Sequence, residues 1–307
     1  MGYASKAVAT RASGDAAIGQ TPKLEAEISE AARFVRQHVI ASIYRAGSGH
    51  PGGSLSCADL LAALFGAELN VWANAVNDPM RDRFVLSKGH AAPALYAIGA
   101  HHGFCDKKES LALRKMGSPF QGHPHIDELP WVETSTGSLG QGFSVALGMA
   151  MGLKLQKSPS RVYALLGDGE LQEGEIWEGA MCAAHHRLDN FCAIIDYNKL
   201  QSDARNDTIM RLEPLAAKWR AFDWAVAEID GHDIDQILST FRRVDATRER
   251  PSVIIAHTVK GKGVPYMENI PAWHGSVKLT REQAQDALHA LGASHNEIKE
   301  YLDGDTR

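Results

Sequence analysis

Two side chains in the sequence could hold one metal ion between them. Asp168 and Asn198 stand 30 positions apart, and each follows an apolar stretch that is typical of a buried strand. Ligands of open α/β sheets bind outside the carboxyl ends of the strands, where neighbouring parallel strands are about 4.8 Å apart. Carboxylate and amide oxygens suit Mg²⁺ rather than zinc. The spacing therefore predicts a magnesium site shared by two strand ends.

Glycines surround the first of these side chains. Gly167 and Gly169 flank Asp168, so that a diphosphate can approach the backbone amides closely. Mg²⁺ prefers about six oxygens, of which proteins usually supply only a few, and water and phosphate oxygens would complete the set. Glu170 and Glu173 follow and oppose an anion, a conflict that a metal between carboxylate and phosphate resolves. The segment therefore predicts a diphosphate bound through its metal.

The fourteen histidines are the unusual feature of the composition. Several of them lie beside glycine, in loops rather than on a helix face: His50, His90, His123, His232 and His274. Loop histidines of this kind are expected to face a cleft, although any one of them alone could be a surface residue. For His232 we expect a structural role, in ordering the turn before a helix capped at Asp233. The pairs His101-His102 and His185-His186 are expected to lie on the surface.

The apolar pattern around Asp168 predicts a βαβ unit. Residues 162–166 and 191–195 are predicted strands, and residues 173–185 are predicted to form the helix between them. Because such connections are right-handed and join parallel strands, both strands should end at the same edge. Asp168 and Asn198 then follow them on that edge.

Strands and helices alternate through the rest of the chain. Further strands are predicted over residues 83–87, 225–229 and 252–256, and helices over residues 24–45, 57–65, 93–100, 143–155, 214–222, 233–244 and 280–302. Ser56 is predicted to cap the second helix, and residues 116–142 are predicted to be a long functional loop. The alternation predicts an α/β fold with a doubly wound, mostly parallel sheet and helices on both faces. Residues 23–307 are predicted to form one domain.

Composition and charge indicate which partners and which cellular compartment are expected for the protein. The net charge is −5 and no long basic run occurs, which argues against nucleic acid or an anionic membrane as the main partner. No apolar run is long enough to span a bilayer. The four cysteines form no CxxC pair, which fits a reduced, cytoplasmic setting without a zinc ribbon. Residues 1–22 lack the core of a secretory signal and are predicted to be a disordered tail, with a transit peptide as the alternative.

Taken together, the motifs resemble those of transketolases over residues 25–280. Gly-Asp-Gly at 167–169, followed by Asn198, is similar to the signature of thiamine-diphosphate enzymes. The matching segments follow in family order: Ser48-Gly49-His50-Pro51-Gly52-Gly53, Leu86-Ser87-Lys88-Gly89-His90, Gly122-His123-Pro124, Thr136-Gly137-Ser138-Leu139-Gly140-Gln141-Gly142, Gly167-Asp168-Gly169-Glu170-Leu171-Gln172-Glu173-Gly174, Asp196-Tyr197-Asn198-Lys199 and Trp273-His274-Gly275. The resemblance implies the diphosphate-binding (PP-type) domain of the thiamine-diphosphate-binding fold, here as the N-terminal subunit of a split transketolase.

The resemblance also implies a role for each matching residue. Mg²⁺ would be bound by Asp168, Asn198 and the backbone carbonyl of Leu200. Thiamine diphosphate would be bound by His90, Gly137, Leu139, Gly167, Asp168, Gly169, Glu173, Asn198, Leu200 and His274, with Gly137 and Leu139 at the edge of its aminopyrimidine ring. The catalytic residues would be His50, His90, His123, His274 and Glu173. Glu173 and Glu178 would lie at a subunit contact, with an exposed helix position as the alternative for Glu178.

Transketolases use the cofactor to move a two-carbon ketol unit from a ketose phosphate to an aldose phosphate, and histidines suit the exchange of hydroxyl protons near neutral pH. The family also needs a glutamate and an aromatic pocket for the pyrimidine ring, both from a second domain. About 32 residues follow Gly275, too few for such a domain. The resemblance therefore implies a C-terminal, pyrimidine-binding partner subunit in an α2β2 heterotetramer, and no activity for this chain alone. His125 departs from the family pattern, which leaves donor recognition open.

Three alternatives remain open from the sequence. The chain could belong to a deoxyxylulose-phosphate-synthase-like complex, or to a split 2-oxo-acid dehydrogenase, in which the α chain carries Gly-Asp-Gly too. The Ser-Gly-His-Pro-Gly and Gly-His-Pro segments argue against the dehydrogenase. A non-catalytic regulatory subunit is the third alternative, and the intact candidate site argues against it.

Overall fold

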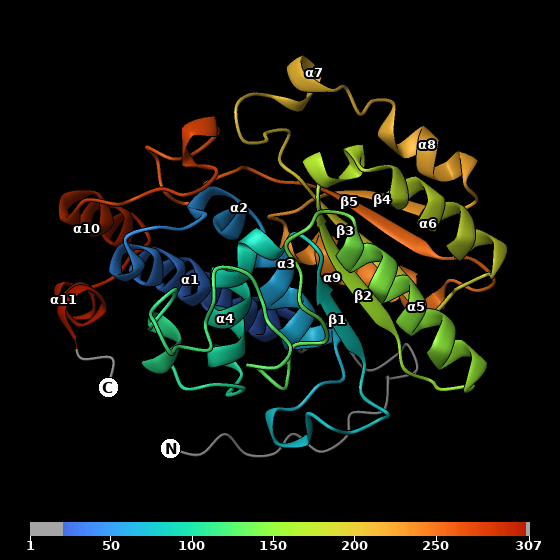
Figure 1. Ribbon diagram of the computed structural model, residues 1–307, viewed down its shortest axis with the longest axis horizontal. Coiled ribbons are helices and arrows are strands. Elements are labelled where there is room, and N and C mark those ends of the chain that lie inside the picture. The colour runs from blue at the N-terminus through green and yellow to red at the C-terminus, as the bar shows by residue number, and fades with distance from the viewer. Residues whose placement is uncertain (1–20, 305–307) are drawn as a thin grey trace.

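The computed structural model describes residues 21–304, and its centre is a five-stranded parallel sheet (Figure 1). The strands are β1 (Arg83–Leu86), β2 (Val162–Gly167), β3 (Phe191–Tyr197), β4 (Ala225–Asp230) and β5 (Ser252–His257). Their order in the sheet is β1-β2-β3-β5-β4, and all neighbours are parallel. The carboxyl ends of the strands therefore share one edge, the edge at which ligands bind in such sheets.

Helices cover both faces of this sheet. The helices are α1 (Thr21–Ala46), α2 (Pro51–Ser56), α3 (Ala58–Ala63), α4 (Ala92–His101), α5 (Gln141–Leu155), α6 (Gly174–His185), α7 (Asn206–Ile209), α8 (Leu215–Ala221), α9 (Ile234–Ala246), α10 (Arg281–Ala290) and α11 (His295–Asp303). One apolar core joins the sheet to α1, α3, α4 and α9, and a second joins it to α5, α6 and α8. Figure 1 shows these two helix layers on opposite sides of the strands. The predicted doubly wound α/β fold is confirmed.

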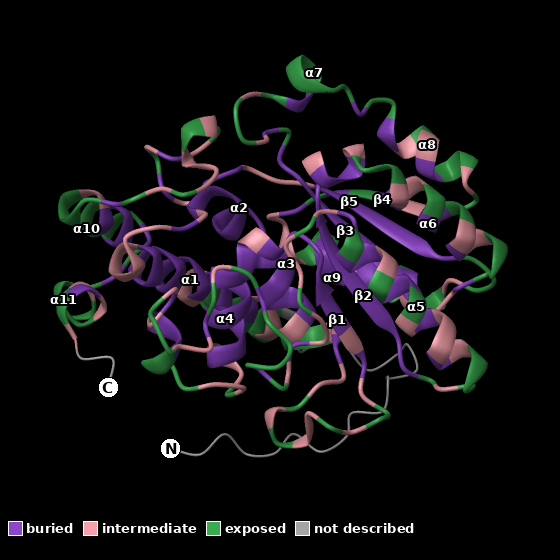
Figure 2. Cartoon of the chain, in the orientation of Figure 1, coloured by how far each residue is buried: buried purple, intermediate pink, exposed green. Residues whose placement is uncertain are grey.

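The strands are buried on both faces, and their side chains alternate between the two cores. In β2, Tyr163 and Leu165 belong to the core that contains α1, whereas Val162, Ala164 and Leu166 belong to the core that contains α5. Figure 2 shows the strands as buried ribbons between helices whose outer sides are exposed. This double burial explains why the strands read in the sequence as continuous apolar runs.

The βαβ unit around the candidate metal residues is confirmed. β2 and β3 are parallel neighbours, with Val162 opposite Phe191 and Gly167 opposite Asp196. α6 connects them. β3 runs two residues further than predicted, to Tyr197, so Asn198 is the first residue beyond the strand.

Two local predictions are wrong. Ser56 does not cap a helix, because Pro51 begins α2 one turn earlier than expected and Ser56 is the last residue of that helix. Proline is favoured at a first helical position because its fixed φ suits the helix and its missing N–H is not needed there. The predicted helix over residues 280–302 is two helices, because Gly292 adopts a φ of +75° between them. Thr280 and Ser294 each cap the following helix through a capping box.

Other predictions agree with the structure or fall outside it. Asp233 caps α9 by accepting the N–H of Gln236, as expected. Residues 112–140 form turns without a helix or a strand, in line with the predicted long loop. Residues 1–20 of the predicted tail lie outside the described residues, and α1 already begins at Thr21. Within the described part of the chain, none of the helices combines the length and apolar character needed to cross a membrane.

Candidate cofactor-binding site

The structure brings Asp168 and Asn198 to the same short backbone segment. Asp168 Oδ2 accepts the N–H of Lys199, and Asn198 Oδ1 accepts the N–H of Leu200 at 3.1 Å. Asp168 Oδ1 also accepts the N–H of Gly169 at 2.8 Å. Both side chains are buried. Two strand ends thus bring a carboxylate and an amide to the same short segment. That the two side chains share a metal ion stays a prediction.

Gly169 opens a short 3₁₀ turn over Gly169–Gln172 directly after Asp168. A Cβ atom at Gly169 would lie 3.3 Å from Cβ of Gln201, tighter than ordinary packing. Glycine therefore lets the turn and the segment after β3 approach each other closely. A diphosphate at this edge would meet backbone rather than a side chain at this position.

Lys260 lies beside the candidate metal residues, although no role was predicted for it from the sequence. Its Nζ donates to the carbonyl of Leu200 at 2.7 Å and lies 2.7 Å from His274 Nδ1. Burial lowers the pKa of Lys260 to about 8, although the Asp168 carboxylate favours its charge. A buried cation beside the candidate metal ligands would be compensated by the negative charge of a diphosphate. The available signal was a lysine among glycines shortly after the end of β5.

The oxygen set fits Mg²⁺ only with help from a ligand. No group of three or more His, Cys, Asp or Glu residues within residues 21–304 could hold a metal ion. Asp168, Asn198 and the Leu200 carbonyl offer one carboxylate and two neutral oxygens, so phosphate and water oxygens would have to complete the shell. Burial, and then the nearby Asp196 charge, raises the pKa of Asp168 to about 6. Because burial makes the charged form of Asp168 unfavourable, a bound divalent cation would stabilise that charge.

Four of the glycine-flanked histidines form one cluster. The ring centroid of His50 lies 5.4 Å from that of His90, 6.2 Å from that of His123 and 6.0 Å from that of His274. The rings of His90 and His274 are 5.3 Å apart. The four loops that carry these residues start far apart in the sequence, and the fold brings all four rings together. Four of the five glycine-flanked histidines therefore lie together, without His232. That they face a cleft stays a prediction.

These histidines are uncharged at neutral pH in the protein without ligands. Burial first, and the charge of Arg114 second, lowers the pKa of His50 to about 4. Burial and Lys260 lower the pKa of His274 to about 3, and burial also lowers the pKa values of His90 and His123. Neutral imidazoles can accept hydrogen bonds from hydroxyl groups. The exchange of protons near neutral pH that was expected of them would require a bound anion to raise these pKa values.

The loop 136–140 approaches the cluster from the side of β1. Thr136 Oγ1 donates to the carbonyl of Leu86 at 2.8 Å. A Cβ at Gly137, where φ is +149°, would lie 3.0 Å from the ring of His123. Gly137 and Leu139 thus lie in a loop beside the histidines, where an elongated ligand could reach both this loop and Asp168.

A buried ion pair between Lys88 and Asp196 lies next to Asn198. The Nζ atom of Lys88 donates to Asp196 Oδ2 and to the carbonyl of Gly53 at 2.8 Å. Asp196 also accepts hydrogen bonds from Ser56 at 2.6 Å, from Thr258 and from Asn198 Nδ2 at 3.3 Å. The last bond fixes the amide of Asn198 with its oxygen away from Asp196. No role for Asp196 was predicted from the sequence.

Glu173 and Glu178 do not join the histidine cluster in this chain. Both side chains are exposed, Glu173 just before α6 and Glu178 on its outer side. Their proposed position at a subunit contact stays a prediction.

The remaining histidines have structural surroundings. His232 Nδ1 lies 2.7 Å from Asp59 Oδ2, and its Nε2 accepts the N–H of Val259 at 2.8 Å. This agrees with the expected structural role. His185 and His186 are exposed as predicted. The prediction for the other pair is wrong, because His101 and His102 are half-buried against the rings of Phe34 and Phe65.

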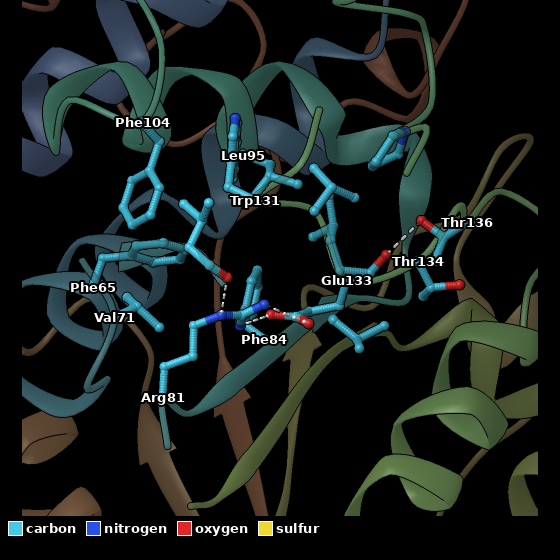
Figure 3. Close-up of a pocket in the computed structure, with 15 residues that line it drawn as sticks. Phe65, Val71, Arg81, Phe84, Leu95, Phe104, Trp131, Glu133, Thr134 and Thr136 are labelled. Atoms are coloured by element: carbon cyan, nitrogen blue, oxygen red, sulfur yellow. Dashed lines mark hydrogen bonds and ion pairs between the residues drawn. The ribbon is translucent and has the colours of Figure 1, made fainter. Parts of the chain in front are cut away.

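An apolar pocket beside β1 is not the candidate site. It lies among residues such as Phe65, Leu95 and Trp131 (Figure 3), and its volume is about 30 Å³. That volume is close to the space one water molecule occupies in the liquid, far below the several hundred Å³ of a typical cofactor site. The ion pair between Arg81 and Glu133 closes one side.

Gly275 permits the contact between the two loops that carry His50 and His274. A Cβ atom at Gly275 would lie 2.2 Å from Cδ2 of His50, so that any side chain must displace this imidazole. We expect Gly275→Ala to lower kcat/KM of a reaction at this site by up to about 10²-fold, since small displacements of reacting groups have effects of this size. Steady-state kinetics would measure kcat/KM, and thermal unfolding would show whether the variant is still folded. Gly66→Ala is the control, because its Cβ would make only an ordinary contact of 3.5 Å with Ile28. Equal activity of the two variants would contradict the expectation.

The fold and the site define an α/β protein with a candidate diphosphate and cation site at the carboxyl edge of a parallel sheet. The family model described as "Transketolase, thiamine diphosphate binding domain" matches residues 27–300. The chain therefore belongs to the transketolase family, through its thiamine-diphosphate-binding domain, and the predicted family is confirmed.

Relatives of two lengths match this chain. It is 41% identical over 269 residues to a subunit of the apulose-4-phosphate transketolase of Phocaeicola vulgatus, covering 88% of this chain and 95% of that protein. The 6-deoxy-6-sulfo-D-fructose transketolase subunit SqwG of a Clostridium species is 41% identical over 265 residues, with 86% and 96% covered. The transketolase of Homo sapiens is 37% identical over 281 residues, with 91% of this chain but 44% of that protein covered.

A solved structure of transketolase from Campylobacter jejuni superposes with a TM-score of 0.81 at 29% identity. The match covers 92% of this chain and 46% of that one. This chain thus spans about half the length of the transketolases of Homo sapiens and Campylobacter jejuni that it matches.

Proposed function

We propose that this chain is the thiamine-diphosphate-binding subunit of a split transketolase, in which it holds the diphosphate and Mg²⁺. The observation that carries the proposal is that Asp168 and Asn198, at adjoining strand ends, bind the N–H groups of consecutive residues beside a cluster of four histidines. Family membership and two relatives of nearly equal length, both named as transketolase subunits, support it. The chain would act only with a second subunit.

Different residues of this chain would bind the two ends of the cofactor, the diphosphate and the aminopyrimidine ring. Asp168, Asn198 and the carbonyl of Leu200 would bind Mg²⁺, and Lys260 would neutralise diphosphate charge. Gly167 and Gly169 would leave room for the diphosphate, which His90 and His274 would contact. The backbone of Gly137 and Leu139 would face the edge of the aminopyrimidine ring. When bound, thiamine diphosphate supplies the carbon nucleophile and the electron sink of the reaction.

The histidines would bind the sugar substrate. His50, His123 and His274 are uncharged by burial and so can accept hydrogen bonds from the hydroxyl groups of a ketose donor. An anionic ligand nearby would raise their pKa values and make them better bases. These residues would orient the donor and move hydroxyl protons, and the walls formed by both subunits would exclude water. Glu173 would act through the subunit contact.

The partner would supply the pyrimidine-binding domain. Both relatives of similar length are named as subunits of a transketolase, which supports a two-chain enzyme, and we propose an α2β2 assembly in the cytoplasm. The substrates would be sugar phosphates. The names of these relatives specify different ketoses, so the donor should be sought with a panel that includes xylulose 5-phosphate, fructose 6-phosphate and apulose 4-phosphate.

Reconstitution tests this proposal directly. We expect the chain alone to show no ketol transfer, and the chain mixed with its pyrimidine-domain subunit, thiamine diphosphate and Mg²⁺ to convert at least one ketose phosphate of the panel. The measurement is coupled detection of the released aldose with ribose 5-phosphate as acceptor. Removal of Mg²⁺ with a chelator should abolish the rate, and its re-addition should restore it. Failure of the mixture with every donor, or decarboxylation of pyruvate in preference to them, would refute the proposal.

A further inference from the structure

Glu170 is a fully buried carboxylate in the middle of the site, and the proposed mechanism gives it no role. Its exposed fraction is 1%. From the sequence, its charge is expected to oppose a bound anion. Instead, both of its oxygens are occupied by hydrogen bonds from other parts of the chain.

The three bonds of Glu170 join three separate segments. Glu170 Oε1 accepts the hydroxyl of Ser87, just after β1, and the N–H of Gly140 at 2.9 Å. Glu170 Oε2 accepts the N–H of Gly167, at the end of β2, at 3.0 Å. One side chain therefore connects the ends of two strands to the loop 136–140.

This connection sets the distance between two parts of the proposed cofactor site. Glu170 lies one residue beyond Gly169, so its backbone belongs to the turn that would receive the diphosphate. Its side chain holds Gly140, one residue from Leu139 in the loop that would face the aminopyrimidine ring. Gly140 has a φ of +88°, and a Cβ there would lie 2.5 Å from Glu175 Oε1, so this close approach of the loop to α6 requires glycine.

We propose that Glu170 is a positioning residue that fixes the loop 136–140 at the distance from Asp168 that thiamine diphosphate requires, without touching the cofactor. The inference rests on the proposed function. It separates two contributions to binding: the diphosphate end, which Asp168 and Asn198 hold, and the aminopyrimidine end, which depends on the loop that Glu170 anchors.

Glu170→Gln tests this role with little change in shape. An amide has one accepting oxygen, so either Gly140 or Gly167 would face an NH₂ group and lose its acceptor. Loss of such an indirect partner typically weakens a bound group by roughly 10- to 100-fold. We expect the Kd of thiamine diphosphate with Mg²⁺ to rise by that factor. The Kd of inorganic pyrophosphate with Mg²⁺ should change less than about threefold, since pyrophosphate does not reach the loop.

Both affinities are measured by titration calorimetry on the complex of the full chain with its partner subunit. Glu133→Gln is the matched control. Glu133 is a half-buried carboxylate a few residues before the loop 136–140, and it forms ion pairs with Arg81 and Arg83 at the start of β1. Its ratio of the two Kd values should equal that of the wild type. Should Glu170→Gln not fold, Glu170→Asp gives the same comparison, because its shorter side chain cannot span both strand end and loop.

The outcomes are distinct. A larger Kd for thiamine diphosphate alone supports the inference. Equal losses for both ligands, or no loss for either, overturn it and leave the proposed function standing. Wild-type protein that binds thiamine diphosphate no more tightly than pyrophosphate overturns the proposed function instead.

Discussion

Asp168→Asn should reduce the ketol-transfer activity of the assembled enzyme by at least roughly 10²- to 10³-fold, the size of effect seen when one preorganised electrostatic group is removed from an active site. The amide keeps the shape of the side chain but loses the negative charge that would hold Mg²⁺. Asp168 also accepts two backbone N–H groups, from Gly169 and Lys199, and an amide can accept only with its oxygen. The apparent Kd of Mg²⁺ in the presence of thiamine diphosphate should therefore rise as well.

The same variant should leave the cofactor-free fold intact. Burial raises the pKa of Asp168 to about 6 in the folded chain, above the usual value of an aspartate. The cost of the charged form is therefore complete above the folded pKa of about 6, and it is lost as the pH falls from there to the unfolded pKa. Replacing the carboxylate by a neutral amide at pH 7.5 removes this cost and also removes one of the two backbone hydrogen bonds. Because the two effects oppose each other, the midpoint of thermal unfolding measured without cofactor should change little.

The control for this experiment is Asp207→Asn. Asp207 lies on the same connection after β3, but it is exposed and pairs with Arg205. Its replacement should change neither activity nor Mg²⁺ affinity. If Asp168→Asn retained activity close to that of the wild type, the assignment of the metal site would be wrong.

Lys88→Met should give the largest loss of stability. Lys88 and Asp196 form an ion pair in which the two side chains are 1% and 0% exposed. Burial opposes the charge on each, but each partner outweighs that effect, so that the pKa of Lys88 is raised and that of Asp196 is lowered. Removing one partner of a buried pair leaves the other charge uncompensated, at a cost of about 3–5 kcal/mol. Urea unfolding of the cofactor-free chain would measure the change.

The loss should depend on pH in a defined direction. In the wild type, the contribution of Asp196 is present above its unfolded pKa and is lost as the pH falls through its lowered folded pKa. Without Lys88, burial disfavours the Asp196 charge, and the carboxyl can escape the penalty by taking up a proton as the pH falls. The difference in unfolding free energy between wild type and variant should therefore be larger at pH 8 than at pH 5.5.

Two further variants distinguish the contribution of the buried ion pair from the effect of replacing any lysine by methionine. Lys88→Met combined with Asp196→Asn should lose less stability than the sum of the single changes, because neither partner is then left charged and unpaired. Lys154→Met is the control, since the Lys154–Asp189 pair is 36% and 22% exposed and should contribute no more than about 1 kcal/mol. Additive losses in the double variant would contradict the account of the pair.

The sequence was sufficient to predict the strands and the meeting of Asp168 and Asn198 at one edge of the sheet. The apolar runs before Asp168 and Asn198 predicted two buried strands, and the helix between them made the strands parallel neighbours. Once two parallel strands adjoin, the residues after them must meet at one edge. The glycine-flanked histidines were predicted to face a cleft for a different reason, because a histidine in a glycine-flanked loop is not packed into a helix face. These are consequences of local pattern and of simple rules of chain connection.

Only the tertiary structure decided which side chains support that site. Ser56 was predicted to cap a helix, yet its hydroxyl donates to Asp196, 140 residues away. Lys88 bonds Gly53 and Asp196, Lys260 bonds the carbonyl of Leu200, and Glu170 bonds Ser87 and Gly140. Each of these partners depends on the sheet order β1-β2-β3-β5-β4 and on the way the loops fold over its edge. Periodicity and spacing report which elements form, but a buried charge finds its partner only after those elements have packed, because its hydrogen bonds join segments that are distant along the chain.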